Sequence, residues 1–227
     1  MAYQSECFAE DGHVLTVTQA DALNSMGTII ILHAVYGVTD HIVNLCNKFA
    51  EAGISAKAPW LFDRIGDGVV HPYTSQGTDA GRGSYAGISE REILLDVAAC
   101  SREAQKKGPV AICGFCTGGT WAWVSAALLD LEAALVFYGS QVADHVNRKP
   151  KCPVELHYGD SDFVVPFDVI TQIKDANPGI ALHIYPGCNH AFFNPDQRFY
   201  DQDASSLLWS RSLEFLRQRF SEIKRKD

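Results

Sequence analysis

Long apolar segments are missing from this sequence. The longest apolar runs, such as residues 28–32 (TIIIL), are as long as one β-strand, whereas a membrane-spanning helix needs about 20 apolar residues. The N-terminal residues MAYQSECFAEDG contain acidic side chains and no apolar core like that of a signal peptide. We therefore expect a protein that has no membrane or export segment and is cytoplasmic.

Positive charge is also scarce. The 19 Lys and Arg residues are outnumbered by 27 Asp and Glu residues, so the formal net charge is −8. Proteins that bind nucleic acid carry clustered Lys and Arg side chains that neutralise phosphates, and this balance argues against that class. The expected partner is a small molecule, with no nucleic acid, membrane or cofactor involved, and the chain is expected to be a monomer.

Repeats, low-complexity tracts and linkers rich in Pro, Gly or Ser are absent, which predicts one domain over residues 1–227. Short runs rich in Val, Ile and Leu alternate with helix-like segments, a pattern typical of βαβ units and a mainly parallel sheet. The predicted strands cover residues 28–33, 54–58, 109–113, 133–138, 153–158 and 180–185. The fold class is therefore α/β, and ligands are expected at the C-terminal ends of the strands.

Three helices have clear local signals. Thr39 can cap a helix that runs to about Ala52, and residues 89–92 (SERE) form a capping box for a helix that ends near Gly108. A third helix is predicted from residue 204 to about Lys224. Its apolar face would consist of positions 207, 208, 213, 216 and 220.

Two further segments are less regular. Residues 13–18 (HVLTVT) alternate between polar and apolar side chains, which predicts an antiparallel edge strand. Residues 59–87 are rich in Gly and Asp, show no clear element and are long for a loop. Loops of this length are often binding loops or lids.

The seven cysteines are an odd number in a chain without an export signal, which predicts free thiols. Cys113 and Cys116 lie close together in residues 110–123, VAICGFCTGGTWAW. A redox pair would need Cys113 exposed at a helix N-terminus, yet this residue ends an apolar strand and should point into the sheet. A zinc site would need a second pair of ligands; Cys188 and His190 could supply it only through folding.

Residues 114–118, GFCTG, favour a third interpretation, a Gly-x-nucleophile-x-Gly elbow between a strand and a helix. The turn is so tight that it needs glycine on both sides, and it pushes the central side chain, Cys116, out above the sheet. The helix N-terminus favours a thiolate, and the amide of Thr117 can stabilise an oxyanion. The alternative is a Gly-rich turn with a buried Cys116.

An elbow of this type predicts an acid and then a His further along the chain. The strand at 154–158 is followed by Asp160 and Asp162, and the residues alone leave both open. His190 follows the strand at 181–185, where a general base should lie. His183 lies within that strand and is expected to be a packed or surface residue, and the other histidines do not fit the order.

At these motifs the sequence resembles the dienelactone hydrolase family of α/β-hydrolases over nearly its whole length. The matching segments are 114–119 (GFCTGG), 158–166 (YGDSDFVVP), 185–192 (YPGCNHAF), 35–38 (VYGV) and 58–64 (APWLFDR). The resemblance implies an α/β-hydrolase fold with Cys116 as nucleophile, His190 as base and Asp162 as orienting acid. It also implies an oxyanion hole made by the backbone amides of Val35 and Thr117.

The substrate pocket is less fully matched. Arg64 matches an arginine with which the family holds a substrate carboxylate, but Asn194 stands where type members have a second arginine. We expect Tyr85, Tyr138 and Phe192 to line the pocket. These residues predict an altered or relaxed substrate range.

Another departure from the family is Ala34, which replaces a glutamate that helps to hold the resting thiol neutral. Without it we expect a permanent thiolate–imidazolium pair, and a hydrolase of carboxylic esters or lactones that forms an acyl-thioester on Cys116. Two alternatives remain: a hydrolase-fold protein without turnover that acts as a binding module, and a thiol redox sensor that uses Cys113 and Cys116. No metal is expected at the site.

Overall fold

The computed structural model describes residues 1–223 of the chain. Their contacts divide the chain into two compact units, Met1–Ala111 and Ile112–Asp227. Strand β5 (Val110–Phe115) begins in the first unit and ends in the second. The helix predicted to reach about Lys224 is α6 (Gln202–Ile223), and its predicted last residue lies outside the described part.

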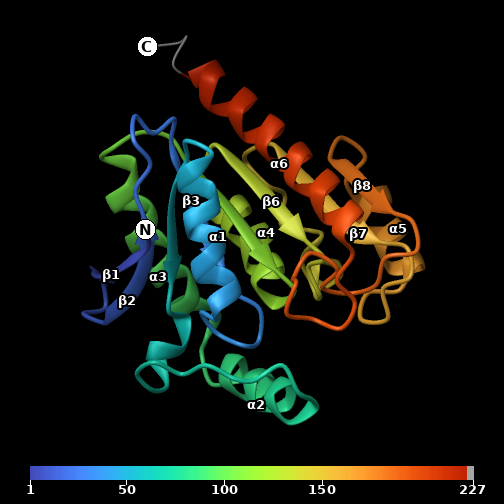
Figure 1. Ribbon diagram of the computed structural model, residues 1–227, viewed down its shortest axis with the longest axis horizontal. Coiled ribbons are helices and arrows are strands. Elements are labelled where there is room, and N and C mark those ends of the chain that lie inside the picture. Colours follow the sequence, from blue (N-terminus) through green and yellow to red (C-terminus); the bar gives the residue numbers. More distant parts are fainter. Residues whose placement is uncertain (224–227) are drawn as a thin grey trace. The chain divides into compact units, whose positions relative to one another are not determined.

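The first unit contains four strands in the order β1-β2-β4-β3. Strands β1 (Tyr3–Phe8) and β2 (Val14–Ala20) are antiparallel, β2 and β4 (Ser55–Pro59) are antiparallel, and β3 (Thr28–Leu32) runs parallel to β4. Helices α1 (Asp40–Glu51) and α3 (Glu90–Gln105) cover opposite faces of these strands (Figure 1). Every residue of β3 and β4 is buried, as expected for strands covered on both faces.

Strand β2 corrects one prediction. The alternating segment 13–18 does form an antiparallel strand, but β2 pairs with β1 on one side and β4 on the other and is therefore not an edge. Its neighbour β1 was not predicted, because its sequence YQSECF is mostly polar. Exposed edge positions tolerate polar side chains, so hydrophobic runs do not reveal such a strand.

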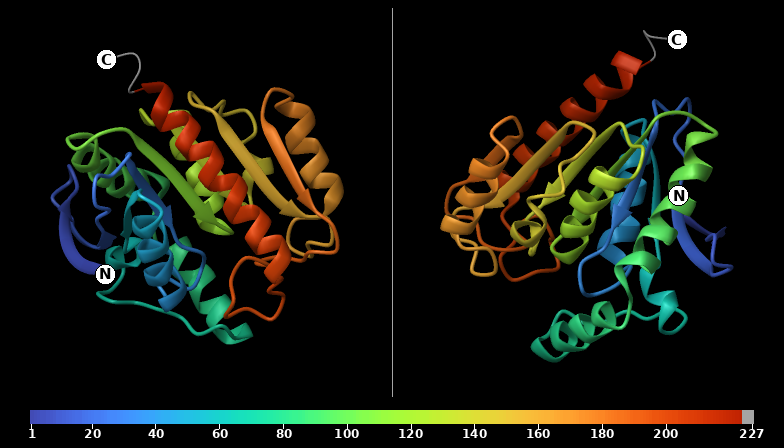
Figure 2. Two further views of the ribbon diagram at one scale, coloured as in Figure 1. Left: turned by 45° about the horizontal axis from the view of Figure 1, so that its top comes forward. Right: turned by 180° about the vertical axis from the view of Figure 1, so that it is seen from behind.

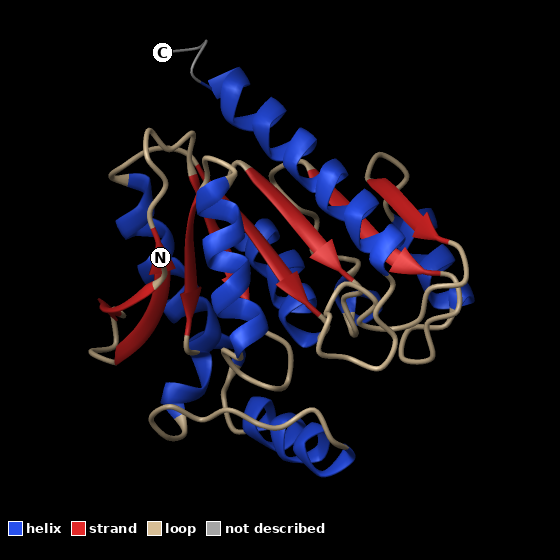
Figure 3. Ribbon diagram, viewed as in Figure 1, coloured by secondary structure: helices blue, strands red, loops and turns tan. Residues whose placement is uncertain are grey.

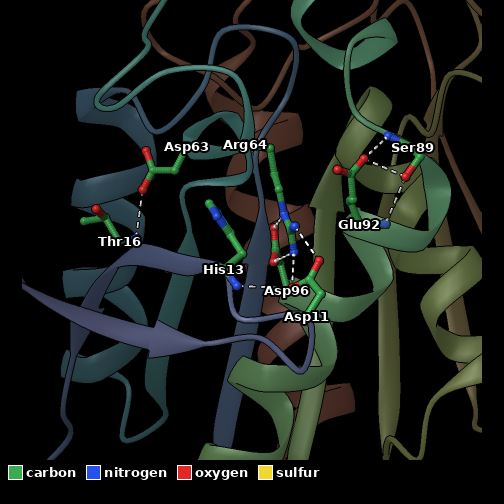
Figure 4. A network of polar contacts seen from close by, with 8 residues as sticks. All are labelled: Asp11, His13, Thr16, Asp63, Arg64, Ser89, Glu92 and Asp96. Atoms are coloured by element: carbon green, nitrogen blue, oxygen red, sulfur yellow. Dashed lines mark hydrogen bonds and ion pairs between the residues drawn. The ribbon is translucent and has the colours of Figure 1, made fainter.

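The predicted helix starts occur where expected, although one cap differs in detail. Thr39 is the N-cap of α1, but its hydroxyl makes no capping bond and instead hydrogen-bonds the Tyr73 hydroxyl at 2.8 Å. Ser89 and Glu92 form the predicted capping box of α3: the Ser89 hydroxyl accepts from the Glu92 amide at 3.3 Å, and the Glu92 carboxylate accepts from the Ser89 amide at 2.8 Å (Figure 4).

Residues 59–87 are more regular than predicted. They contain a 3₁₀ turn, η1 (Leu61–Arg64), and helix α2 (Ser75–Ala86), which Thr74 caps by accepting from the Gly77 amide at 3.1 Å. The sequence of α2, SQGTDAGRGSYA, conceals a helix because glycine lowers helix propensity. A Cβ atom at Gly81 would lie 1.8 Å from the Val35 carbonyl oxygen, so this glycine allows α2 to pack directly on the backbone.

The second unit contains strands in the order β5-β6-β7-β8. Strands β6 (Ala133–Phe137), β7 (Val154–Gly159) and β8 (Ala181–Tyr185) run parallel to one another, as the arrows in Figure 3 show. Helices α4 (Thr117–Leu128) and α6 cover opposite faces of these strands, and α5 (Phe167–Ala176) lies between β7 and β8 along the chain (Figure 2). A short turn, η2 (Val142–His145), follows β6.

Helix α6 buries a face that differs in part from the predicted one. Leu208, Leu216 and Phe220 are fully buried as predicted, but Leu207 is exposed and its place on the buried face is taken by small residues, Ser205 and Ser212. The Ser212 hydroxyl donates to the Leu208 carbonyl oxygen at 2.8 Å, which satisfies it inside the packed face. A serine can therefore occupy a helix–sheet contact that a hydrophobic pattern does not reveal.

Candidate active site

Cys116 lies at the tight turn between β5 and α4. Its backbone has φ 55° and ψ −117°, a conformation that L-residues rarely adopt, and it is the N-cap residue of α4. Such a strained non-glycine residue is uncommon and tends to occur at functional sites. The backbone of Cys116 is held on both sides, since its amide donates to the Phe137 carbonyl at 3.1 Å and its carbonyl accepts from the Ser140 amide at 3.1 Å.

The glycines around Cys116 are required by close backbone contacts. A Cβ atom at Gly114 would lie 2.0 Å from the Gly118 carbonyl oxygen, and one at Gly119 would lie 2.9 Å from the Gly139 Cα atom. Real Cβ atoms do not approach the backbone so closely, so each position needs hydrogen in place of a side chain. The predicted elbow is therefore present as a strand–turn–helix unit with Cys116 at its centre.

Asp162 is buried in the turn that follows β7. Its Oδ1 atom accepts from the amides of Val164 at 2.7 Å and Val165 at 2.9 Å, and its Oδ2 atom accepts from Nδ1 of His190 at 2.7 Å. Asp160, the other carboxylate that the residues left open, is exposed and accepts instead from the Gly187 amide at 2.7 Å. The structure thus brings Asp162, and not Asp160, to the histidine.

His190 lies in the loop after β8 and is 8% exposed. While Nδ1 faces Asp162, the Nε2 atom is buried and has no hydrogen-bond partner among the described residues. The edge of the ring contacts Tyr138, with the ring centroids 5.0 Å apart. This arrangement fixes the ring and leaves Nε2 as the nitrogen that can exchange a proton.

The electrostatics of the site connect His190 to Cys116. Burial raises the pKa of the Cys116 thiol, but the positive charge of His190, the Thr117 amide and the Ser140 hydroxyl outweigh this effect and lower the pKa below its ordinary value. Burial lowers the pKa of His190, yet the Cys116 thiolate and the Asp162 carboxylate raise it well above its ordinary range. Both directions favour a thiolate–imidazolium pair at neutral pH.

Asn189 and Ser140 were missed from the sequence. The Asn189 side-chain oxygen accepts from the amides of His190 at 2.8 Å and Phe163 at 3.2 Å, so it joins the turn of the acid to the turn of the base. Ser140 contributes its hydroxyl beside the Cys116 thiolate. Asn and Ser are common in loops, and only the fold reveals these contacts.

The two amides expected to form the oxyanion hole belong to different units. Thr117 is the first residue of α4, where backbone N–H groups lack intrahelical partners, so its amide is suited to bind an anion. Val35 lies in the loop after β3, and the Tyr85 hydroxyl fixes this loop by donating to the His33 carbonyl oxygen at 2.7 Å. The role of Val35 stays a prediction from the resemblance.

The guanidinium group of Arg64 is already engaged within the first unit. It donates to both carboxylate oxygens of Asp96, at 3.0 and 2.6 Å, and to both of Asp11, at 2.6 and 3.3 Å (Figure 4). These bonds use four of its five N–H groups, and its side chain is only 8% exposed. Arg64 therefore joins η1, α3 and the β1–β2 turn, and a role in holding a substrate carboxylate stays a prediction from the resemblance.

The three aromatic candidates for the pocket are all buried. Phe192 is completely inaccessible and packs against Tyr138 and Tyr185. Tyr138 contacts the His190 ring directly. Tyr85 packs against Phe62 and His33 in the first unit. Of the three, Tyr138 is the one whose contact with a proposed catalytic residue the structure shows.

The family model that matches this sequence, described as the dienelactone hydrolase family, covers residues 13–220. The chain belongs to the dienelactone hydrolase family. Among its relatives, a Yersinia pestis protein provisionally named carboxymethylenebutenolidase is 30% identical over 210 residues, which are 84% of this chain and 77% of the relative. A Synechocystis protein with the same provisional name is 27% identical over 209 residues, or 84% of this chain and 85% of that protein. This dienelactone hydrolase family member is thus an enzyme of the carboxylic ester hydrolase class.

Solved structures agree on the fold of this family member. A crystal structure provisionally named dienelactone hydrolase, from Klebsiella pneumoniae, has a TM-score of 0.84 with 23% identity, covering 96% of this chain and 98% of that one. A dienelactone hydrolase-like promiscuous phosphotriesterase from metagenomic libraries has a TM-score of 0.78 with 18% identity, covering 98% of both. The predicted α/β-hydrolase fold is therefore confirmed. None of the helices described here is long and apolar enough to cross a membrane.

Proposed function

We propose that this protein hydrolyses carboxylic esters or lactones through an acyl-thioester on Cys116, with His190 as general base and acid and Asp162 as the group that orients it. The observation that carries the proposal is the 2.7 Å hydrogen bond between His190 and Asp162, together with the pKa of Cys116, which His190 lowers against the effect of burial. A purely structural cysteine would need neither the strained backbone of Cys116 nor the electrostatic coupling of its thiol to an Asp–His pair.

The proposed reaction has two steps. The Cys116 thiolate attacks the acyl carbon, the Thr117 amide stabilises the oxyanion, and protonated His190 gives its proton to the leaving alkoxide. His190 then removes a proton from water, which cleaves the thioester and releases the acid. Asp162 holds the ring through Nδ1 during both steps, so that Nε2 carries the exchanged proton.

Two observations favour a neutral ester as substrate. Arg64 is engaged by Asp11 and Asp96, and Asn194 is 7% exposed, with its side-chain oxygen accepting from the Asp196 amide at 2.9 Å. Neither residue therefore offers a free charge to a carboxylate. A substrate without a second anionic group fits these residues best.

The redox alternative is disfavoured by the position of Cys113. This residue is completely buried in β5, where an oxidant from solvent cannot reach it without opening the strand. The binding-module alternative still rests on Ala34 and Asn194. A measurement of ester turnover distinguishes it from a hydrolase.

The test compares kcat/KM for a small neutral aryl ester and for dienelactone in the wild-type protein, Cys116→Ala and Cys152→Ala. Cys152 is a half-buried free thiol that serves as a matched control. We expect the neutral ester to be the better substrate, Cys116→Ala to lose at least about 10³-fold in kcat/KM, and Cys152→Ala to retain activity. Rapid quenching should leave the acyl group on the peptide that contains Cys116.

Three results would change the assignment. Full activity in Cys116→Ala would exclude the thioester, and no turnover of either substrate by the wild-type protein would favour the binding module. If dienelactone were the better substrate, a carboxylate site other than Arg64 and Asn194 would have to exist.

A further inference from the structure

A second cluster of polar side chains lies in the strands of the second unit, apart from the proposed catalytic residues. Glu155 and His157 belong to β7 and His183 belongs to β8; His157 and His183 are register partners of these parallel strands. One ligand atom from each of the three lies within 4.8 Å of the other two, and within residues 1–223 this is the group found that could hold a metal ion.

The facing atoms of the cluster lie within ion-pair distance of one another but make no hydrogen bond. Oε2 of Glu155 lies 3.5 Å from Nε2 of His157 and 3.3 Å from Nε2 of His183. Yet all three atoms are buried and none has a hydrogen-bond partner in the described chain. Buried polar atoms of native proteins nearly always make a hydrogen bond, so three that converge without one are consistent with a common partner.

We propose that Glu155, His157 and His183 bind a divalent transition metal ion, zinc being the best match. Two imidazole nitrogens and one carboxylate oxygen are a ligand set that zinc uses, with a fourth position open to water. Four bonds of about 2.1 Å directed to the corners of a tetrahedron place ligand atoms about 3.4 Å apart. The two distances from Glu155 match this spacing.

One ligand is already oriented by a neighbour. The Nδ1 atom of His157 shares a hydrogen bond of 2.9 Å with the Tyr185 hydroxyl, which leaves Nε2 facing the cluster. Metal-binding histidines typically have such a second contact at the other ring nitrogen, where it fixes the ring and its tautomer. His157 itself is completely buried.

The ring of the other histidine, His183, must rotate before its nitrogen can bind a metal ion. The rings of His157 and His183 are stacked with centroids 4.8 Å apart and planes at 29°, whereas a metal lies in the plane of each ring that binds it. The His183 side chain is 23% exposed and lies on β8, the last strand in the sheet order, so its ring is the one with room to turn.

Glu155 connects the cluster to the surface, since its side chain is 15% exposed. This residue lines an open cavity of about 390 Å³ together with residues that include Cys152, Ile180, Phe215 and Arg219. One positive group acts against the ion: the Arg211 guanidinium carbon lies 5.4 Å from the centre of the Tyr185 ring, beside His157. We therefore expect weaker binding than in a closed structural zinc site with four protein ligands.

The first experiment is a cobalt titration followed by absorption spectroscopy, because zinc has a filled d shell and gives no d–d bands. It is carried out in a Cys116→Ala background so that binding at the reactive thiol does not contribute. We expect one Co²⁺ per chain, with a d–d band that disappears in His183→Ala and in Glu155→Gln. The matched control His145→Asn changes a half-buried histidine outside the cluster and should keep the band.

The second measurement is thermal unfolding with and without Zn²⁺. A ligand present at 100 times its dissociation constant should raise the melting temperature by about 5–10 °C, and the rise should vanish in His183→Ala and Glu155→Gln. The two variants are independent, and circular dichroism establishes that each is folded. No d–d band at millimolar cobalt, or a band that persists in both folded variants, would overturn the proposal. The proposal would also be overturned if a thiolate-to-cobalt band appeared and the d–d band that the variants should lose did not. Such a band would show that cobalt binds to cysteine.

Discussion

At the scale of single residues, two opposing effects act on the pKa of Cys116: burial of the thiol and the positive charge of His190. Burial is the largest single effect and raises the pKa of Cys116, but the charge and hydrogen bond of His190, together with Thr117 and Ser140, outweigh it, so the net direction is downward. Thr117 and Ser140 add hydrogen bonds to the thiolate. Since Ala34 stands where type members of the family carry a glutamate, no carboxylate at that position holds the thiol neutral.

The first residue-scale prediction is the pH dependence of Cys116 alkylation by iodoacetamide. The thiolate is the reactive form, so the rate should stay high well below the free-thiol pKa of about 8.5 and fall only as the pH drops through the lowered pKa of Cys116. In His190→Gln the cation is removed, and the profile should move towards higher pH. A wild-type rate that rises only around the free-thiol pKa would contradict the permanent ion pair.

The second residue-scale prediction concerns Asp162. In Asp162→Asn the partner of His190 Nδ1 becomes neutral and can present an amide N–H, which destabilises the imidazolium and the required tautomer. We expect kcat/KM for the neutral ester to fall by about 10²–10⁴-fold. Asp160→Asn is the matched control, because Asp160 is an exposed carboxylate in the same turn and does not contact His190. Equal losses in both variants would argue against Asp162 as the orienting acid.

At the scale of elements, Arg64 connects η1 to two other parts of the first unit. Asp96 comes from α3 and is completely buried, while Asp11 comes from the turn between β1 and β2. Burial raises the pKa of Asp96 although Arg64 opposes this. The guanidinium group thus compensates a carboxylate that would otherwise be costly to bury.

We predict that Arg64→Leu destabilises the protein by about 3–5 kcal/mol, because Asp96 is left buried without its partner. Without the cation, the pKa of Asp96 rises further above its unfolded value. The variant is therefore more stable below that pKa and loses stability as the pH rises through it, so the loss relative to wild type should be smaller at pH 5 than at pH 8. Urea unfolding at the two pH values measures this.

The matched control is Arg82→Leu, since Arg82 is exposed and pairs only weakly with Asp79 at 3.5 Å. KM for the neutral ester should be unchanged in Arg64→Leu under conditions where the variant is folded. A large rise in KM for anionic esters without a change in stability would support a substrate-binding role of Arg64.

At the scale of the whole molecule, the elements and motifs that could be predicted from the sequence are those that local patterns encode. Buried parallel strands such as β6 are continuous apolar runs, and the order of the candidate nucleophile, acid and His can be read along the chain. The edge strand β1 and helix α2 were missed because their sequences are polar or rich in glycine. The partners of Arg64, and the cluster of Glu155 with His183, are distant in sequence and meet only in the fold.

The sequence predicts that the whole chain is one domain. We therefore propose that both compact units unfold together. Strand β5 starts in the first unit and ends in the second, so neither unit can unfold completely without disrupting this strand. Buried cysteines report on each unit: Cys46 and Cys100 in the first, Cys113 and Cys188 in the second. Pulsed alkylation with mass spectrometry across a urea series should give one midpoint for all four thiols. Separate midpoints for the two pairs would show that the chain contains two domains.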